Sequence, residues 1–254
     1  MRAIDSAIAL SVHLGRPLRL IWPISAEMGC GFGDLFEPVP RIVGVEQPDL
    51  RRLGGALRYR LGIELLRRRN RAYRDRDHYA LKTRGYDFRG IGGGVLHYAL
   101  CHPFFENPRP FAEFVPVGDL RSRIDALATD GRVGIHVRRT DNARAIERSP
   151  LSAFMAAMEA EISADPGVGF FLATDSPEDE RVLTERFPAR ITAQSSKSLD
   201  RSTASSARDA VVDLYALSRC RKIIGSDFSS FTDVASGIRG VPRVIAGVKD
   251  LPGG

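Results

Sequence analysis

The sequence predicts an α/β protein built from parallel sheets and organised in two lobes. From residue 116 onward, short apolar segments alternate with longer segments of helical periodicity, which favours a parallel sheet covered on both faces. A connector rich in proline and phenylalanine, residues 103–116, separates this regular half from a less regular N-terminal half. The 254 residues, 43% of them hydrophobic, suffice for one substantial core or two small ones. We therefore expect domains over residues 1–111 and 112–254.

The N-terminal half begins with the pattern of one helix followed by two short strands. Apolar residues recur at helical spacing over 3–14, and Gly-Arg-Pro at 15–17 ends this helix. Short apolar segments at 18–22 and 41–45 predict strands with an irregular, glycine-containing loop between them. A second helix is expected over 56–69.

Arginines cover most of the helix expected over 56–69. This face is interpreted either as an anion-binding or acceptor-binding surface or as an ordinary solvated face, and charge runs of this kind are usually solvated. The segment Gly90 to Gly94 has the composition of a phosphate-binding loop, but no clear helix opens after it. A flexible turn is therefore favoured there.

The C-terminal half repeats a strand-and-helix pattern. A helix at 117–127 leads it, and residues 194–206, rich in Ser, Thr and basic side chains, are expected to form a loop. The other expected strands are 132–137, 169–174, 190–192, 221–225 and 242–246, and the other helices are 151–163, 177–186, 208–218 and 230–237.

Composition argues against several classes of protein. No apolar run approaches the roughly 20 residues that a membrane span needs, and residues 1–14 show an amphipathic pattern instead of that of a signal peptide. The three cysteines lack the spacing of a zinc site or a disulfide framework. We therefore expect a cytoplasmic protein without a metal site.

The charge points to an anionic ligand. The formal net charge is +6, and nearly all of the cations are arginines, since only Lys82, Lys197, Lys222 and Lys249 are lysines. A guanidinium group binds phosphate through two parallel hydrogen bonds, so this bias suits a phosphate-containing ligand. Charge alone leaves nucleic acid open.

Polar residues cluster after the strands expected in the C-terminal half. In an open α/β sheet, ligands bind at the carboxyl ends of the strands. The opposite edge offers mostly turns such as 165–167 and 240–242. The three polar strand ends comprise Arg138, Arg139, Thr140 and Asp141; Thr174, Asp175 and Ser176; and Ser226, Asp227, Phe228, Ser229 and Ser230.

Two adjacent arginines follow the first of these strands. Because successive side chains point in different directions, one can bind a diphosphate while the other pairs with a carboxylate such as Asp141 or faces solvent. His136 is expected on the same face as Arg138.

Two further features suit a nucleotide. Ser229 or Ser230 can cap the following helix, whose N-terminus would attract an anion, although an ordinary N-cap explains the same residues. Asp213 lies among apolar residues of a helix and needs a partner. Guanine, which offers two donors on one edge, and a structural arginine are both open as that partner.

These motifs resemble those of a known enzyme family. The resemblance covers residues 112–246 well and 1–45 loosely, the latter through GRPLRLIWPISAEMGCGFGDLFEP. The related family is the α1,6-fucosyltransferase and nodulation fucosyltransferase group, which shares an HxRxxD-type motif. The similar segments are HVRRTD, FFLATDSPEDERVLTERFP and DAVVDLYALSRCRKIIGSDFSSFTDVASGI.

The resemblance implies a GT-B architecture, with two Rossmann-like lobes and the donor in the C-terminal one. It also implies GDP-fucose as donor, inversion at the sugar carbon and no metal requirement. By motif, Arg138 would hold the β-phosphate with the help of Arg139, and His136 would contact the guanine end through its backbone.

The later motifs supply the rest of the donor site that the resemblance implies. Asp213 would accept hydrogen bonds from guanine, Ser229 and Ser230 would bind phosphate, and Asp175 would line the cleft. Together with the polar strand ends, the expected donor-binding residues are His136, Arg138, Arg139, Thr174, Asp175, Asp213, Ser226, Phe228, Ser229 and Ser230.

The sequence departs from the family pattern in two places. Related chains carry a strand and a glycine loop before the first helix, whereas this sequence starts at Met1 inside that region, so the N-terminal lobe is expected to be incomplete. The family also places a glutamate ten positions after the motif histidine, where Ile146 stands here with Glu147 beside it. Glu147 and Asp141 are therefore the candidate bases, and Arg138 completes the expected catalytic set.

The predicted function is that of a glycosyltransferase. It would transfer fucose from GDP-fucose to a carbohydrate acceptor by a metal-independent inverting displacement, with arginines neutralising the leaving diphosphate. The missing glycine loop favours a second hypothesis, a non-catalytic nucleotide or nucleotide-sugar binding protein. A third, an arginine-rich nucleic-acid binder, is opposed by the scarcity of aromatic residues among the arginines. The acceptor, and contact with a membrane surface, stay open.

Overall fold

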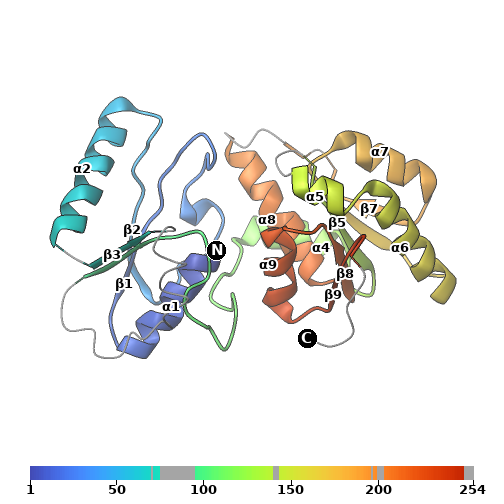
Figure 1. The fold of residues 1–254 in the computed structure, drawn as a ribbon, viewed down its shortest axis with the longest axis horizontal. Coiled ribbons are helices and arrows are strands. Elements are labelled where there is room, and N and C mark those ends of the chain that lie inside the picture. The colour runs from blue at the N-terminus through green and yellow to red at the C-terminus, as the bar shows by residue number, and fades with distance from the viewer. Residues whose placement is uncertain (70, 75–94, 140–142, 196, 199–202, 249–254) are drawn as a thin grey trace. The chain divides into compact units, whose positions relative to one another are not determined.

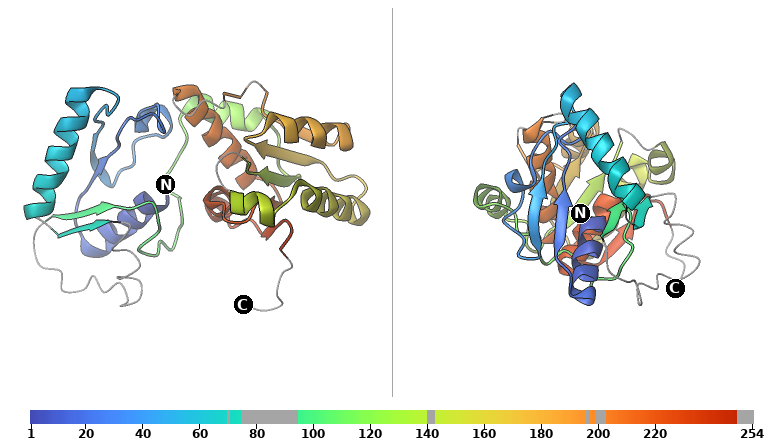
Figure 2. Two further views of the ribbon diagram at one scale, coloured as in Figure 1. Left: turned by 45° about the horizontal axis from the view of Figure 1, so that its top comes forward. Right: turned by 90° about the vertical axis from the view of Figure 1, so that its left-hand side faces the viewer.

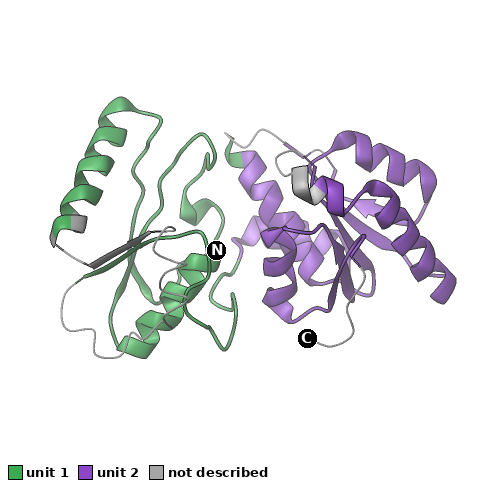
Figure 3. Ribbon diagram, viewed as in Figure 1, with its two compact units in different colours: residues 1–115, 201–204 green, residues 116–200, 205–254 purple. Residues whose placement is uncertain are grey.

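The structure is a computed structural model that describes residues 1–69, 71–74, 95–139, 143–195, 197–198 and 203–248. It divides into two compact units, which Figure 3 shows in two colours. Unit 1 comprises residues 1–115 and 201–204, and unit 2 comprises residues 116–200 and 205–254. The turn expected at Gly90 to Gly94, together with Thr140 and Asp141, lies outside the described residues.

Unit 1 contains short parallel sheets. Within the described residues, β1 pairs with β2 and β3 pairs with β4, both in parallel. Its elements are α1 (Arg2–Leu14), β1 (Leu18–Ile21), the 3₁₀ helix η1 (Phe32–Asp34), β2 (Ile42–Glu46), α2 (Leu53–Arg69), β3 (Arg71–Arg74) and β4 (Leu96–Ala99).

Aromatic side chains pack the interior of unit 1. Phe32 meets Trp22 edge-on at a centroid distance of 5.4 Å, and Phe36 meets Phe114 in the same way at 5.4 Å. Such edge-to-face pairs are favoured by the ring quadrupoles in addition to the buried area. Unit 1 therefore has an apolar core of its own.

Unit 2 is built on one five-stranded parallel sheet with the order β7-β6-β5-β8-β9. All residues of β5 and β6 are buried, as expected for central strands covered on both faces. The strands are β5 (Val133–Val137), β6 (Phe170–Thr174), β7 (Ile191–Ala193), β8 (Lys222–Gly225) and β9 (Arg243–Ile245). The helices are α4 (Gly118–Ala126), α5 (Ala143–Arg148), α6 (Leu151–Ala164), α7 (Pro177–Arg186), α8 (Ala204–Ser218) and α9 (Ser230–Arg239).

Helices flank this sheet on both sides (Figures 1 and 2). Phe154 of α6 and Leu183 of α7 pack in one core with Ile135 of β5. On the other face, α9 contacts β5 through the hydrogen bond between Thr232 and His136. The predicted α/β class, with a parallel sheet covered on both faces, is confirmed.

Two glycines allow the helices to approach the second face closely. A Cβ at Gly134 of β5 would lie 2.8 Å from Leu217 Cδ2 of α8. A Cβ at Gly225, at the end of β8, would clash with the side chain of Thr232 of α9. The bare backbone at both positions therefore sets the distance between the helices and the sheet.

Four short elements were not anticipated from the sequence: the 3₁₀ helix η1, the strands β3 and β4, and the helix α5. Each is only three to six residues long, which is too short to establish a clear sequence period. Among the described helices, none is long and apolar enough to cross a membrane. Within the described residues, none of the three cysteines, Cys30, Cys101 and Cys220, takes part in a disulfide.

Candidate functional site

The sheet order of unit 2 creates a switch point between β5 and β8. The chain runs from β5 outward through β6 to β7, then returns to form β8 on the other side of β5. At such a position the loops leave adjacent strand ends toward opposite faces, and open α/β sheets bind their ligands there. Arg138 follows β5 and Ser226 follows β8, so the two polar strand ends expected from the sequence meet at this point.

Ser226 joins the two strand ends. Its hydroxyl accepts a hydrogen bond from the amide of Arg138 at 3.0 Å and donates to the carbonyl of His136 at 3.3 Å. The amide of Ser226 donates to the same carbonyl at 3.1 Å. The hydroxyl is thus used by the backbone, so Ser226 acts by holding Arg138 in place. The resemblance implies that the backbone of His136 contacts the guanine end of the donor. In the structure, the carbonyl of His136 accepts hydrogen bonds from Ser226.

His136 lies below the switch point and connects β5 to α9. Its Nδ1 is 2.8 Å from Thr232 Oγ1, and its ring stacks on Phe231 with centroids 4.8 Å apart. Burial, reinforced by the charge of Arg138, lowers the pKa of His136 to about 4. The imidazole is therefore neutral at pH 7 and supports the site by packing.

The side chain of Arg139 extends toward α7 and the start of α6. Its Nε donates to Asp179 Oδ2 of α7 at 2.6 Å, and its Nη1 donates to the carbonyl of Ser149 at 2.9 Å. Its amide donates to Asp175 Oδ1 at 2.7 Å, and its guanidinium lies over the ring of Phe154 at 5.9 Å. Arg139 pairs with a carboxylate, as one of the two arginines was expected to do, and it anchors α7 to β5. Its other terminal nitrogen, Nη2, is buried and has no hydrogen-bond partner within the described residues, so its expected assistance at the phosphate stays a prediction.

Helix α9 follows β8, the strand that pairs with β5. Its N-terminus therefore comes after the strand end next to that of Arg138. Ser229 is the N-cap of this ten-residue helix and is 5% exposed, yet its side chain makes no capping hydrogen bond. Within the described part of the chain, Ser229 Oγ is buried and has no hydrogen-bond partner. A buried hydroxyl without a hydrogen-bond partner costs free energy, unless a ligand or a water molecule supplies the partner. Ser230 is exposed at the first position of the helix.

Phe228 occupies a strained backbone position at the mouth of the same turn. Its φ angle is 52°, in the left-handed region that non-glycine residues rarely adopt, and 57% of its surface is exposed. Arg148 lies over its ring at 5.6 Å and pairs with Asp227 at 2.6 Å. Strained residues are often found at ligand sites, and an exposed ring here can contact a bound ligand.

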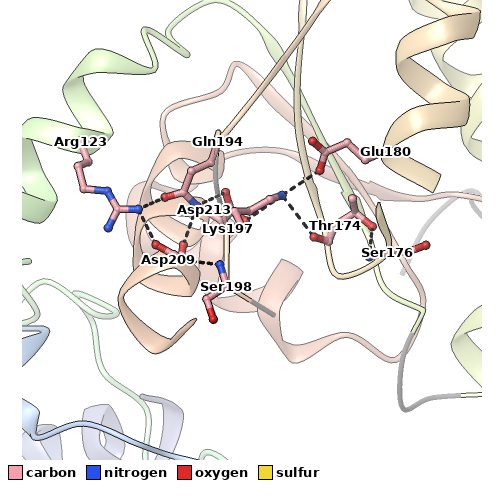
Figure 4. A network of polar contacts seen from close by, with 9 residues as sticks. All are labelled: Arg123, Thr174, Ser176, Glu180, Gln194, Lys197, Ser198, Asp209 and Asp213. Carbon is pink, nitrogen blue, oxygen red and sulfur yellow. Dashed lines mark hydrogen bonds and ion pairs between the residues drawn. The ribbon is translucent and has the colours of Figure 1, made fainter. Parts of the chain in front are cut away.

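Asp213 belongs to a buried polar network, drawn in Figure 4. Its carboxylate accepts from Gln194 Nε2 at 3.3 Å and lies 3.7 Å from Lys197 Nζ. Burial raises the pKa of Asp213 to about 7, and the Lys197 charge opposes this rise. The sequence left guanine or an arginine open as its partner, and in the structure a lysine and a glutamine hold it.

Lys197 is the residue of this network that the sequence did not single out. Its ammonium donates to the Thr174 carbonyl at 3.3 Å and lies 3.3 Å from Glu180 Oε2, and only 9% of its side chain is exposed. The one available signal was its type: a lone lysine in a segment rich in Ser and Thr, within an arginine-dominated chain. It brings the end of β6 together with Asp213 of α8.

Gln194 and Asp209 extend the network toward α4. Arg123 donates to Gln194 Oε1 and, at 2.5 Å, to Asp209 Oδ1. The other oxygen of Asp209 accepts from the amide of Ser198 at 2.8 Å. The network therefore fixes the segment after β7 against α8, next to Asp213 (Figure 4).

A cavity of about 440 Å³ lies beside this network. It borders the end of β6, where Thr174 Oγ1 accepts from the amide of Ser176. It is lined by Thr174, Pro177, Glu180, Arg181, Thr184, Glu185, Gln194, Ser195 and Lys197.

The candidate bases are less well placed. Glu147 lies exposed on α5, which follows β5, and Asp141 is outside the described residues. The described side chains include no group of three or more His, Cys, Asp or Glu arranged to hold a metal ion. The structure thus brings the polar strand ends of unit 2 together at one edge of the sheet and leaves the base unassigned.

Comparison with known proteins identifies the fold. No protein-family model matches the chain, and no curated protein shows significant sequence similarity. A solved structure of NodZ alpha-1,6-fucosyltransferase soaked with GDP-fucose is 22% identical and superposes with a TM-score of 0.59, over 92% of this chain and 86% of that one. Fucosyltransferase NodZ from Bradyrhizobium is 23% identical, with a TM-score of 0.58, over 91% and 86% of the two chains.

A more distant structure has the same fold. A mutant of FUT1 from Arabidopsis thaliana in complex with GDP is 13% identical, with a TM-score of 0.52, over 95% of this chain and 66% of that one. The chain therefore has the GT-B-like α/β fold of these fucosyltransferases, as the sequence motifs predicted.

Proposed function

We propose that this protein is a glycosyltransferase that uses a nucleoside-diphosphate sugar. Within that class we propose GDP-fucose as the donor and a hydroxyl of a carbohydrate as the acceptor. The structures named above are of fucosyltransferases; one was soaked with GDP-fucose and another is in complex with GDP. The polar side chains of unit 2 gather where this fold class binds nucleotides.

One observation carries the proposal: the buried Ser229 hydroxyl that lacks a partner within the described part of the chain. It lies at the N-terminus of α9, where the amides of the first turn and the helix dipole attract an anion. Arg138 is held at the adjacent strand end by Ser226. A diphosphate between Arg138 and α9 would complete the Ser229 hydrogen bond and receive a cationic partner.

The proposed chemistry is a single displacement. The acceptor oxygen attacks the anomeric carbon as the bond to the β-phosphate oxygen breaks, which inverts the configuration. Negative charge develops on the leaving diphosphate, and Arg138 with the α9 amides would stabilise it without a metal ion. Glu147 or Asp141 would take the proton of the acceptor hydroxyl.

Asp213 is proposed to recognise the base. A guanine edge offers two donors, and a carboxylate accepts both. Lys197 and Gln194 already contact Asp213, so base binding would rearrange or share these contacts. Thr174, Asp175 and Phe228 would border the donor from the strand ends.

The decisive experiment is calorimetric titration of GDP into the Arg138→Ala variant, combined with an assay of fucose transfer. Because a charge-assisted hydrogen bond is lost, GDP should bind about ten- to a hundredfold more weakly and turnover should fall below detection. Ser229→Ala, which removes a neutral donor, should weaken GDP binding by about three- to tenfold.

The matched control is Arg186→Ala. Arg186 lies at the end of α7 and pairs with Glu159 on the surface, so its loss should leave GDP affinity unchanged. Wild-type affinity and turnover in Arg138→Ala, with the fold intact by circular dichroism, would exclude the proposed donor site.

The exposed position of Glu147 favours a second candidate, a nucleotide-sugar binding protein without transferase activity. That protein would bind GDP with the same dependence on Arg138 but show neither transfer nor hydrolysis of GDP-fucose. Product analysis with the wild-type chain distinguishes the two.

A further inference from the structure

The outer face of α2 carries a line of exposed leucines. Leu53, Leu57, Leu61 and Leu65 recur every fourth residue, which places them on one side of the helix. Their exposed fractions are 93%, 61%, 57% and 58%. Ala56, Tyr59 and Ile63 occupy the opposite side and are half-buried, so the helix packs on unit 1 through that side and leaves the leucines in solvent. We refer to these four residues as the leucine stripe.

Single exposed apolar residues need no explanation, but four aligned leucines on one helix do. Their exposure costs free energy unless another surface covers them. Figure 1 shows α2 as a long helix at one edge of unit 1. Gly54 and Gly62 weaken its intrinsic helicity, so a covering surface would also stabilise the helix.

The charges around the stripe are almost all positive. Arg58 and Arg60 are exposed, and helical geometry places them on opposite borders of the stripe. Arg51 and Arg52, just before the helix, are exposed and both pair with Asp49, and Arg68, near its end, is exposed as well. The one acidic residue of α2, Glu64, falls on the same face as the leucines by helical spacing and lies 3.7 Å from Arg68.

We propose that the leucine stripe docks α2 on the surface of a bilayer containing anionic phospholipid. The leucines enter the boundary between headgroups and acyl chains, and the bordering arginines lay their aliphatic stems along the apolar surface and extend their charged ends toward the phosphates. Charge complementarity selects this occupant. A second copy of the chain would bring two sets of arginines together, and these would repel each other.

Vesicle flotation of the full chain tests this surface. The protein should float with vesicles of equal parts phosphatidylglycerol and phosphatidylcholine at 50 mM salt, and at least about tenfold less with pure phosphatidylcholine. Raising the salt to 500 mM should reduce binding to the mixed vesicles, because phosphate contacts are screened. Absence of binding to the mixed vesicles would overturn the proposal.

Two double variants separate the apolar from the electrostatic part. Leu57→Ser with Leu61→Ser, and Arg58→Gln with Arg60→Gln, should each lower vesicle binding about tenfold or more. The matched controls are Val43→Ser, which changes an apolar residue 62% exposed in β2, and Arg41→Gln, at an exposed arginine of the same unit. Both controls should bind as the wild type does. Full binding by the leucine variant would contradict insertion of the stripe.

A fluorescence measurement keeps the test informative if the double variants unfold. Leu57→Trp should show a blue shift of its emission on adding the mixed vesicles, and Val43→Trp should not. Analytical ultracentrifugation without lipid tests the alternative, in which a second copy of the chain binds to the leucine stripe. A dimer of the wild type that disappears in the leucine variant would assign the stripe to self-association and overturn the proposal.

Discussion

At the end of β5, two adjacent arginines have different surroundings. The side chain of Arg139 is used by Asp179 and Ser149, which are close only because α7 and the start of α6 return to this strand end. Arg138 is held through its backbone by Ser226 from β8. The surroundings of the two arginines are therefore set by long-range contacts and cannot be derived from their order in the chain.

His136 leads to a prediction about pH. Its pKa of about 4 lies below the ordinary value of 6.5, so the unfolded chain binds this proton more tightly than the folded chain does. The neutral imidazole contributes stability that is present above pH 6.5 and lost as pH falls toward 4, about 3 kcal/mol in total. Between these pH values, the free energy of unfolding of His136→Gln should fall by about 3 kcal/mol less than that of the wild type.

Urea unfolding followed by circular dichroism at pH 4 to 7 measures this difference. His13→Gln is the control, because His13 is exposed on α1 in unit 1. Arg138, Asp175 and Lys197 also act on the His136 charge, so an NMR titration of the imidazole in the native protein should accompany the unfolding series. Equal pH dependence in the His136 variant and the wild type would contradict a buried neutral histidine.

At the scale of elements, the position of α9 determines the proposed anion site. Its N-terminus is placed by the contact between Thr232 and the backbone at Gly225 and by the hydrogen bond of Thr232 to His136. The polar end of β6 is joined in the same way to α8, through Lys197 and Asp213. The strands position the polar residues at their ends, and single contacts with α8 and α9 set how far these residues lie from the helices.

Gly225→Ala should disturb this arrangement. The new Cβ overlaps the side chain of Thr232, so α9 must shift away from β8, at a cost of about 1–3 kcal/mol in the free energy of unfolding. GDP binding should weaken at least about tenfold, because the α9 amides move with the helix. Calorimetry and urea unfolding measure both effects.

Gly167→Ala serves as the matched control for the glycine substitution. A Cβ there meets Asp165 at an ordinary 3.5 Å, so neither stability nor GDP affinity should change appreciably. A Gly225→Ala protein that binds GDP as tightly as the wild type would show that the position of α9 does not matter for the ligand.

At the scale of the whole molecule, the proposed donor-binding residues all belong to unit 2. Each unit has its own apolar interior, aromatic in unit 1 and centred on β5, β6, α6 and α7 in unit 2. Units with separate cores are expected to fold independently. The leucine stripe, in contrast, belongs to unit 1, so membrane docking and donor binding are separable properties of the chain.

Residues 116–254 produced alone should therefore fold and bind GDP. We expect an affinity within about tenfold of that of the full chain, cooperative unfolding and no fucose transfer, because the acceptor side is absent. Arg138→Ala in the same fragment should weaken this binding about ten- to a hundredfold, as in the full chain. A folded fragment that fails to bind GDP, while the full chain binds it, would show that unit 1 contributes to the donor site.

The spacing of apolar residues along the chain was sufficient to predict the helices of several turns and the strands that are apolar over their full length. The helix 177–186 was predicted with its observed bounds, since Pro177 follows the capping residue Ser176 and acidic residues fill the first turn. The strands β5 and β6 were predicted because each is a short, continuous apolar segment. The strands β3 and β4 and the helix α5 were missed because they are only four to six residues long. So short a segment establishes no clear period, and pairing or packing with distant residues decides its structure.

The sequence by itself determined that the C-terminal half is a parallel α/β layer whose strands end in polar residues, because periodicity and strand ends are local properties. It also supplied the motifs that indicated a GT-B fold. Only the tertiary structure decided that β5 and β8 are neighbours, that Arg139 turns toward α7, and that Lys197 and Gln194 hold Asp213. These facts join residues far apart along the chain, and contacts at that range follow from the packing of whole elements.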